Sequence, residues 1–218
     1  LAPPALHFSG HRAFFEALPM STRLSNTFAR LRESNTPAFV AYVAAGDPDF
    51  DRSLEILHAL DRAGADVIEL GVPFSDPLAD GLVNQLAAER ALKAGMNVSR
   101  VLDLIREFRK SATTPLVVFT YLNPIYAYGY ERFHHDASEA GADGILLLDL
   151  PPDEAAHNSE LADQAGLHPI RLIAPNTPEN RVKLLAESAD GFIYALSRTG
   201  VTGTQTAPLQ AAGDTVHH

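Results

Sequence analysis

Short apolar segments alternate with amphipathic segments from Pro37 onwards, and this alternation constrains the fold more than any other feature. The segments between the apolar runs are helix-like; in the first, Leu54, Leu57 and Leu60 recur at the spacing of one helix face. Six strand candidates, rich in β-branched and aromatic residues, occupy residues 38–44, 66–72, 115–122, 144–150, 170–174 and 191–197. Strands that alternate with helices form a parallel sheet, and the helices bury such a sheet on its faces.

Two layouts satisfy this pattern: an open, doubly wound sheet and a TIM (β/α)₈ barrel. The first turn reads AAGDPDF and lacks the GxGxxG of dinucleotide-binding open sheets. Polar residues gather at the carboxyl ends of the strands, where barrels build their active sites. We therefore predict an α/β TIM barrel with six of its eight β/α units in this chain, because only 21 residues follow Ser197.

Charge and composition exclude several classes of binding partner and of catalytic site. The net charge of -10 argues against nucleic acid as the main partner, because phosphate backbones need clustered cations. The negative charge does not exclude a small phosphorylated substrate, since backbone N–H groups at helix N-termini can bind phosphate. The chain has no cysteine, which excludes disulfides and thiol catalysis, and it has no apolar run of membrane-spanning length.

The N-terminal 19 residues, LAPPALHFSGHRAFFEALP, are interrupted by proline and make a poor secretory signal. We expect residues 1–19 to be an N-terminal extension, disordered or upstream of a natural start at Met20. Residues 20–218 should form the incomplete barrel domain, which begins with a helix that Ser21 or Ser25 caps. A cytoplasmic location is the expectation for such a chain.

Two carboxylates stand close together in VIELGVPFSDPLADG, residues 67–81. Alternation places Glu69 on the same strand face as Val67 and Gly71. If that face is the barrel interior, burial raises the pKa of the carboxyl and suits it to general acid–base work. Alternatively, Glu69 is a structural acid paired with an arginine or with backbone N–H groups. Asp80 lies in the following loop, where an acid is commonly solvated or caps the next helix.

Longer motifs identify a family. The segment ELGVPFSDPLADG closely resembles the signature of the tryptophan synthase α subunits. Other segments match the same family in the same order, namely GDP at 46–48, YLNPI at 121–125, LLLDLP at 146–151 and SRTGVTG at 197–203. The resemblance covers roughly residues 20–210 and implies a TIM-barrel carbon–carbon lyase of tryptophan biosynthesis.

The resemblance implies a retro-aldol cleavage of indole-3-glycerol phosphate to indole and glyceraldehyde 3-phosphate. It places the catalytic glutamate at Glu69 and the catalytic aspartate at Asp80. The subunit itself would need no metal and no cofactor. The indole would pass to a β subunit that carries pyridoxal phosphate, in an α₂β₂ heterotetramer.

The resemblance also implies further site residues. Loop 73–80 would contact the β subunit, chiefly through Pro73 and Asp76. SRTGVTG would be a mobile lid, in which Thr202 orients Asp80 and Gly203 offers an N–H to the substrate phosphate. The residues that line the indole pocket or border it would be Tyr42, Phe119, Tyr121, Leu146, Asp149 and Tyr194.

The sequence departs from the family pattern in two ways. The family usually has ADGP with an isoleucine before the glutamine, and here Leu82 and Asn84 stand in ADGLVNQ. The loops after strands seven and eight, which supply most of the phosphate site, have no counterpart. We therefore expect the chain as written to be inactive or poorly folded. Three alternatives stay open: another phosphate-binding barrel lyase or isomerase, a truncated relative that only binds and modulates a β subunit, and a stand-alone indole-releasing lyase.

Overall fold

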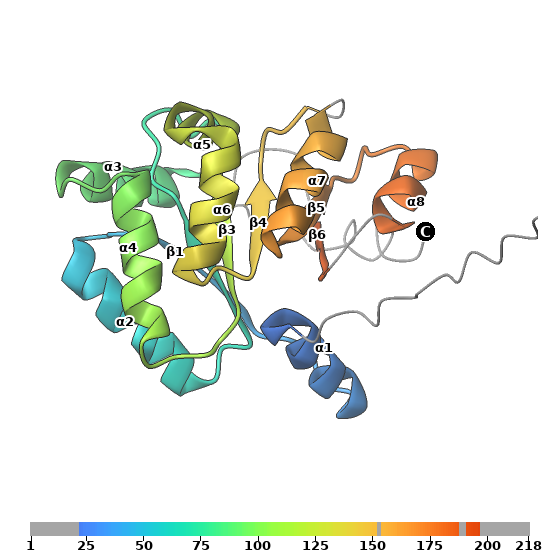
Figure 1. Ribbon diagram of the computed structural model, residues 1–218, viewed down its shortest axis with the longest axis horizontal. Coiled ribbons are helices and arrows are strands. Elements are labelled where there is room, and N and C mark those ends of the chain that lie inside the picture. The colour runs from blue at the N-terminus through green and yellow to red at the C-terminus, as the bar shows by residue number, and fades with distance from the viewer. Residues whose placement is uncertain (1–21, 152–153, 188–190, 197–218) are drawn as a thin grey trace, which may run out of the picture.

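A computed structural model describes residues 22–151, 154–187 and 191–196. Its six strands are all parallel and lie in the order of the sequence, forming a half-barrel (Figure 1). The strands are β1 (Val40–Ala44), β2 (Val67–Gly71), β3 (Leu116–Thr120), β4 (Gly144–Leu147), β5 (His168–Ile173) and β6 (Ile193–Ala195). The predicted class and the six β/α units are therefore confirmed, and the sheet order excludes the doubly wound alternative, in which the strand order reverses.

The described part of the chain contains eight helices, most of which cover the outer face of the half-barrel (Figure 1). They are α1 (Arg23–Glu33), α2 (Phe50–Ala63), α3 (Leu82–Lys93), α4 (Val98–Arg109), α5 (Leu122–Tyr128), α6 (Tyr130–Ala140), α7 (Ala155–Ala165) and α8 (Glu179–Glu187). None of the helices in the described ranges is long and apolar enough to cross a membrane.

Two apolar clusters lie on opposite faces of the sheet. The larger one packs the outward strand residues against the helices and includes Ile68, Leu70 and Phe108. The smaller one fills the interior of the half-barrel, where Leu24 and Phe28 of α1 pack against inward residues of β2 to β5. Helix α1 therefore covers the interior instead of the outer face, as its hydrophobic stripe allows.

The helix ends follow local capping rules. Thr22 caps α1, and Ser25 completes a reciprocal capping box with it, so the prediction that Ser21 or Ser25 would be the cap is wrong by position. Gly64 and Gly141 end α2 and α6 in the left-handed conformation, as the repeated RAGAD and EAGAD motifs predict.

A short helix, α5, replaces the end of one predicted strand. The expected run 115–122 ends as a strand at Thr120, and the chain then turns into α5 at Leu122. Pro124 does not prevent this helix, because a proline in the first turn removes no intrahelical hydrogen bond. The structure thus corrects residues 121–122 from strand end to helix start.

Asp143 ties the amino-terminal end of the sheet to two helices. Its carboxylate accepts hydrogen bonds from Arg23 of α1 and Arg109 of α4, each at 2.7 Å, and from the backbone N–H of Leu116 at 2.8 Å. The Asp143 side chain is only 5% exposed. Such a buried, fully hydrogen-bonded carboxylate holds α1 under the half-barrel.

Candidate active site

Glu69 occupies the middle of β2 and points into the half-barrel. Tyr42 of β1 and Val117 of β3 are its partners in register, and its side chain is 4% exposed. Burial raises the pKa of the Glu69 carboxyl from 4.5 to about 7. Its Oε1 atom has no hydrogen-bond partner among the described residues. Burial alone is the cause of the raised pKa, and a carboxyl with this pKa is suited to exchange protons near neutral pH.

Asp80 lies in the loop between β2 and α3, and neighbouring groups hold its carboxylate in place. The hydroxyl of Tyr121 donates a hydrogen bond to its Oδ2 at 2.9 Å, and Asn84 Nδ2 donates to its Oδ1 at 3.5 Å. The Tyr121 oxygen also accepts from the backbone N–H of Ala79 at 2.9 Å. Tyr121 therefore fixes both the loop and the carboxylate that the loop carries.

Asp80 does not cap the helix that follows it. The N-cap of α3 is Gly81, which makes no side-chain cap hydrogen bond. Two side chains of α3 donate to Asp80: Gln85 Nε2 to its backbone carbonyl at 2.8 Å and Asn84 Nδ2 to its carboxylate at 3.5 Å, and within the described residues no hydrogen bond joins the carboxylate to a backbone N–H of α3. This geometry removes the capping alternative and leaves the carboxylate half-buried, with its oxygens directed to Tyr121 and Asn84.

The charges of Glu69 and Asp80 both influence the same tyrosine side chain. The pKa of the Tyr42 hydroxyl is raised well above its ordinary range, first by burial and then by the charges of Asp80 and Glu69, among others. The pKa of Tyr194 is also raised, by burial and then by Glu69. Because one tyrosine responds to both carboxylates, the loop and the strand contribute to one site.

The rings of Tyr42, Phe119 and Tyr194 form an aromatic wall beside Glu69 inside the half-barrel. Phe119 contacts Tyr42 edge-to-face with ring centroids 5.2 Å apart, and it contacts Tyr194 at 6.0 Å. Leu146, the register partner of Phe119, is fully buried beside them. A Cβ atom on Gly71 would lie 2.3 Å from the Tyr42 hydroxyl oxygen, so the glycine makes room for this ring. The rings meet edge-to-face and present largely apolar surface, which suits an aromatic ligand.

Asp149 has a role that the sequence reading did not predict. Its Oδ1 accepts the backbone N–H of Leu122 at 2.7 Å, so this exposed residue caps α5 from the end of β4. The family resemblance places Asp149 beside the substrate, and its visible contact is structural. The sequence signal for this cap was weak, because the donor and the acceptor lie 27 positions apart.

Of the remaining predicted residues, Thr202 and Gly203 lie outside the described ranges, and the loop residues Pro73 and Asp76 lie near the site. Pro73 is buried, and Asp76 is exposed and accepts a hydrogen bond from Ser75. Beyond them the loop and the start of α3 expose large apolar side chains, with Leu78 86% and Val83 77% exposed.

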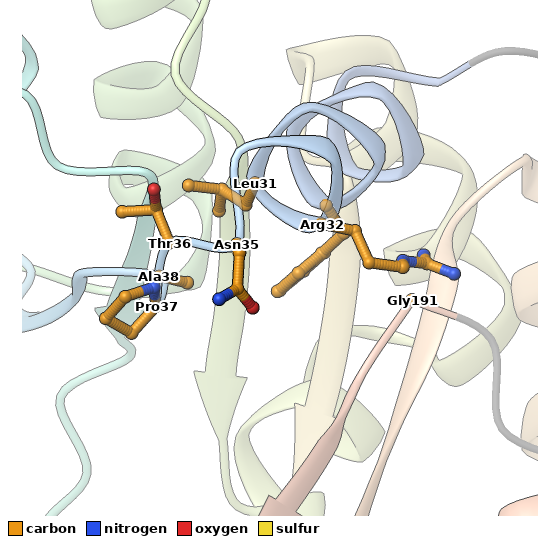
Figure 2. A pocket seen from close by; sticks show the side chains of 8 residues that line it. Leu31, Arg32, Asn35, Thr36, Pro37, Ala38 and Gly191 are labelled. Carbon is orange, nitrogen blue, oxygen red and sulfur yellow. The ribbon is translucent and has the colours of Figure 1, made fainter.

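Two other features are separate from this site. A cavity of about 520 Å³ lies between α1 and the chain segments that lead into β1 and β6, so it faces the amino ends of the strands (Figure 2). Within the described ranges, the one trio of potential metal ligands is His135, Asp136 and Glu139 on the outer helix α6. These three groups already form surface ion pairs with one another and with Arg132.

Comparison with known proteins gives a consistent result. The sequence model of the family described as "Tryptophan synthase alpha chain" matches residues 28–218. The tryptophan synthase alpha chain of Desulfatibacillum aliphaticivorans is 46% identical over 201 residues, which make up 88% of this chain and 76% of the relative. That of Opitutus terrae is 47% identical over 184 residues, covering 84% of this chain and 69% of the relative.

Solved structures agree with the sequence relatives. The structure of Mycobacterium tuberculosis tryptophan synthase superposes with a TM-score of 0.83 at 36% identity, over 90% of this chain and 75% of that one. Sequence family, relatives and fold thus agree with one another. The chain belongs to the tryptophan synthase alpha chain family, the lyase subunits of tryptophan biosynthesis.

Proposed function

We propose, contrary to the expectation from the sequence that the chain is inactive, that this α subunit cleaves indole-3-glycerol phosphate to indole and glyceraldehyde 3-phosphate, with Glu69 and Asp80 as its catalytic residues. The observation that carries the proposal is the buried Glu69 carboxyl, with a pKa of about 7 and an unpartnered oxygen. An unpaired buried carboxyl costs stability, and a group that moves a substrate proton accounts for that cost.

Glu69 acts as the acid and base of the cleavage. The C–C bond breaks when indole C3 gains a proton, because protonation turns the ring into a leaving group. The glycerol hydroxyl beside that bond loses its proton as the aldehyde forms. A carboxyl with a pKa of about 7 is populated in both forms at neutral pH, so it can perform both transfers.

Asp80 stabilises the charge that the first transfer creates. Protonation at C3 leaves positive charge on the indole N–H, and a fixed carboxylate beside it lowers the barrier. The hydrogen bond from Tyr121, at 2.9 Å, keeps this carboxylate from relaxing away when substrate binds. Preorganisation of this kind is worth more in a site that excludes water.

The apolar wall binds the indole ring. Tyr42, Phe119, Leu146 and Tyr194 are buried or half-buried and offer ring edges and a flat aliphatic face. The SRTGVTG segment, with Thr202 and Gly203, is proposed to close over the substrate. The subunit is proposed to need no metal or cofactor of its own, since acid–base and electrostatic catalysis suffice for the bond cleaved.

A β subunit is the partner of this family, and we place its contact on the loop after β2. The exposed apolar side chains of Leu78, Leu82 and Val83 adjoin the exposed Asp76, and a contiguous apolar surface of this kind favours a protein contact. In the proposed α₂β₂ assembly, indole passes to the pyridoxal phosphate of the β subunit. A cytoplasmic location fits this biosynthetic role.

Indole release from indole-3-glycerol phosphate by Asp80→Asn tests the assignment. The variant keeps the shape and the Tyr121 contact but removes the charge, so the rate should fall about 10²- to 10³-fold. Asp51→Asn, an exposed acid on α2, is the matched control and should cleave at the wild-type rate. Near-normal cleavage by Asp80→Asn would refute the role of Asp80.

A further inference from the structure

A second cavity, of about 730 Å³, lies on the outer side of β5 between α7 and α8. Arg171 of β5 and Arg181 of α8 both line it. Arg171 alternates with Ile170 and Leu172, which face the interior, so it points away from the site of Glu69. This cavity, called the α7/α8 groove below, is therefore separate from the active site.

Arg171 is buried in this groove with unused hydrogen-bonding capacity. Its residue exposure is 8%, and its Nη2 donates to the hydroxyl of Ser159. Its Nε is closed off from solvent and has no hydrogen-bond partner among the described residues. Burial lowers the pKa of Arg171, and the nearby Asp163 partly offsets this by raising it. A buried cation with an unpaired donor is costly unless an anion completes it.

The planar guanidinium of Arg171 indicates the shape of that anion. The Nε–H and a neighbouring Nη–H of a guanidinium lie in one plane and fit the two oxygens of a carboxylate. Arg181 lines the same groove and forms no ion pair within the described ranges, so it supplies a second cation. Glu160 and Asp163 also line the groove, which makes its total charge close to neutral. A monoanion therefore fits better than a phosphate dianion.

Apart from the polar Gln164, the rest of the lining is apolar. Ala155 and Ala156 of α7 face Leu184 and Leu185 of α8 across the groove. Leu184 is 63% exposed, although large aliphatic side chains favour burial. A ligand body that covered it would remove this apolar surface from water while its carboxylate reached Arg171.

We propose that the α7/α8 groove binds a small monocarboxylate with an apolar body. Its carboxylate accepts hydrogen bonds from the Arg171 guanidinium, and Arg181 reinforces the charge. Its body lies between the α7 alanines and Leu184. Bound ligand joins α7 to α8 and neutralises the charge of the Arg171 guanidinium.

Benzoate is the probe for this site, and benzamide is its uncharged control of the same shape. Both are titrated into the full chain at constant ionic strength, with binding followed by the arginine Nε–H resonances. Saturable binding of benzoate should shift the Arg171 resonance, and benzamide should bind about tenfold more weakly or worse. Arg171→Met should weaken benzoate binding about tenfold, and Arg181→Gln should weaken it severalfold. Lys183→Gln, an exposed α8 residue paired with Glu179, should leave it unchanged.

Circular dichroism of each variant establishes that it is folded. If Arg171→Met does not fold, the Arg171 resonance of the wild type and the Arg181→Gln titration decide the question. Benzoate binding that does not saturate, that equals benzamide binding, or that leaves the Arg171 resonance unmoved overturns the proposal. Equal binding by the wild type and a folded Arg171→Met variant overturns it as well.

Discussion

Replacing Glu69 by glutamine should make the folded chain more stable at alkaline pH relative to the wild type. The pKa of this carboxyl is about 7 in the folded chain against an ordinary value of 4.5. Between these two values the folded chain keeps a proton that the unfolded chain has released, so stability falls as pH rises through this window. At about 1.4 kcal/mol for each pH step of one, the full loss above pH 7 is about 3 kcal/mol.

Urea unfolding followed by circular dichroism measures this loss. The free energy of unfolding of the wild type is compared with that of Glu69→Gln at about pH 5 and about pH 8. The amide does not titrate, so the stability difference between the two proteins should shift by about 2.5 kcal/mol in favour of the variant between these pH values. The same variant should lose indole release, because an amide transfers no proton.

Glu33→Gln provides the control for this experiment. Glu33 is an exposed residue on α1, so its replacement removes a carboxylate without changing a buried site. Its stability difference from the wild type should stay constant within about 0.5 kcal/mol across the same pH range. A Glu69→Gln difference that is independent of pH, or that shifts in favour of the wild type as pH rises, would refute the reasoning that burial raises this pKa.

Three further substitutions test the surroundings of the site. Tyr121→Phe removes the hydroxyl that holds Asp80, and steady-state kinetics should show a fall in kcat of about tenfold; an unchanged kcat would mean that the loop positions the carboxylate alone. Gly71→Ala forces a methyl group against the Tyr42 hydroxyl and should cost about 1–3 kcal/mol in urea unfolding, with no cost if the ring can turn aside. Asp143→Asn weakens the clamp between two arginines and should cost about 3 kcal/mol, measured in the same way; a stability within error of the wild type would show the clamp to be dispensable.

Much of the fold follows from local patterns. Apolar runs of strand length, each followed by a helix-like segment, require parallel strands with crossover helices, and the six strands were predicted in the observed order. The glycines after α2 and α6 were predicted as left-handed ends because a Cβ is disfavoured there. The start of α5 was missed, because an apolar run of eight residues contains no local signal that a helix begins near its end.

The site was predicted in part. The position of Glu69 on the inner strand face follows from alternation, whereas the roles of Glu69 and Asp80 came from the family motif and stay proposals. The hydrogen bonds of Tyr121 and Asn84 to Asp80 could not be read from the chain. Tyr121 lies 41 positions away from Asp80, and the parallel pairing of β2 with β3 brings the end of β3 to the loop after β2.

The sequence by itself determined the class of fold, the strand order, the inward face of β2 and the family of this protein. These properties depend on periodicity and on contiguous motifs, which are local in the chain. The tertiary structure alone decided the protonation behaviour of Glu69, the fixing of Asp80 by Tyr121 and the burial of Arg171 with its Nε unpartnered. Each of these depends on burial and on partners from distant segments, and desolvation exists only once the packed chain has removed water from the group.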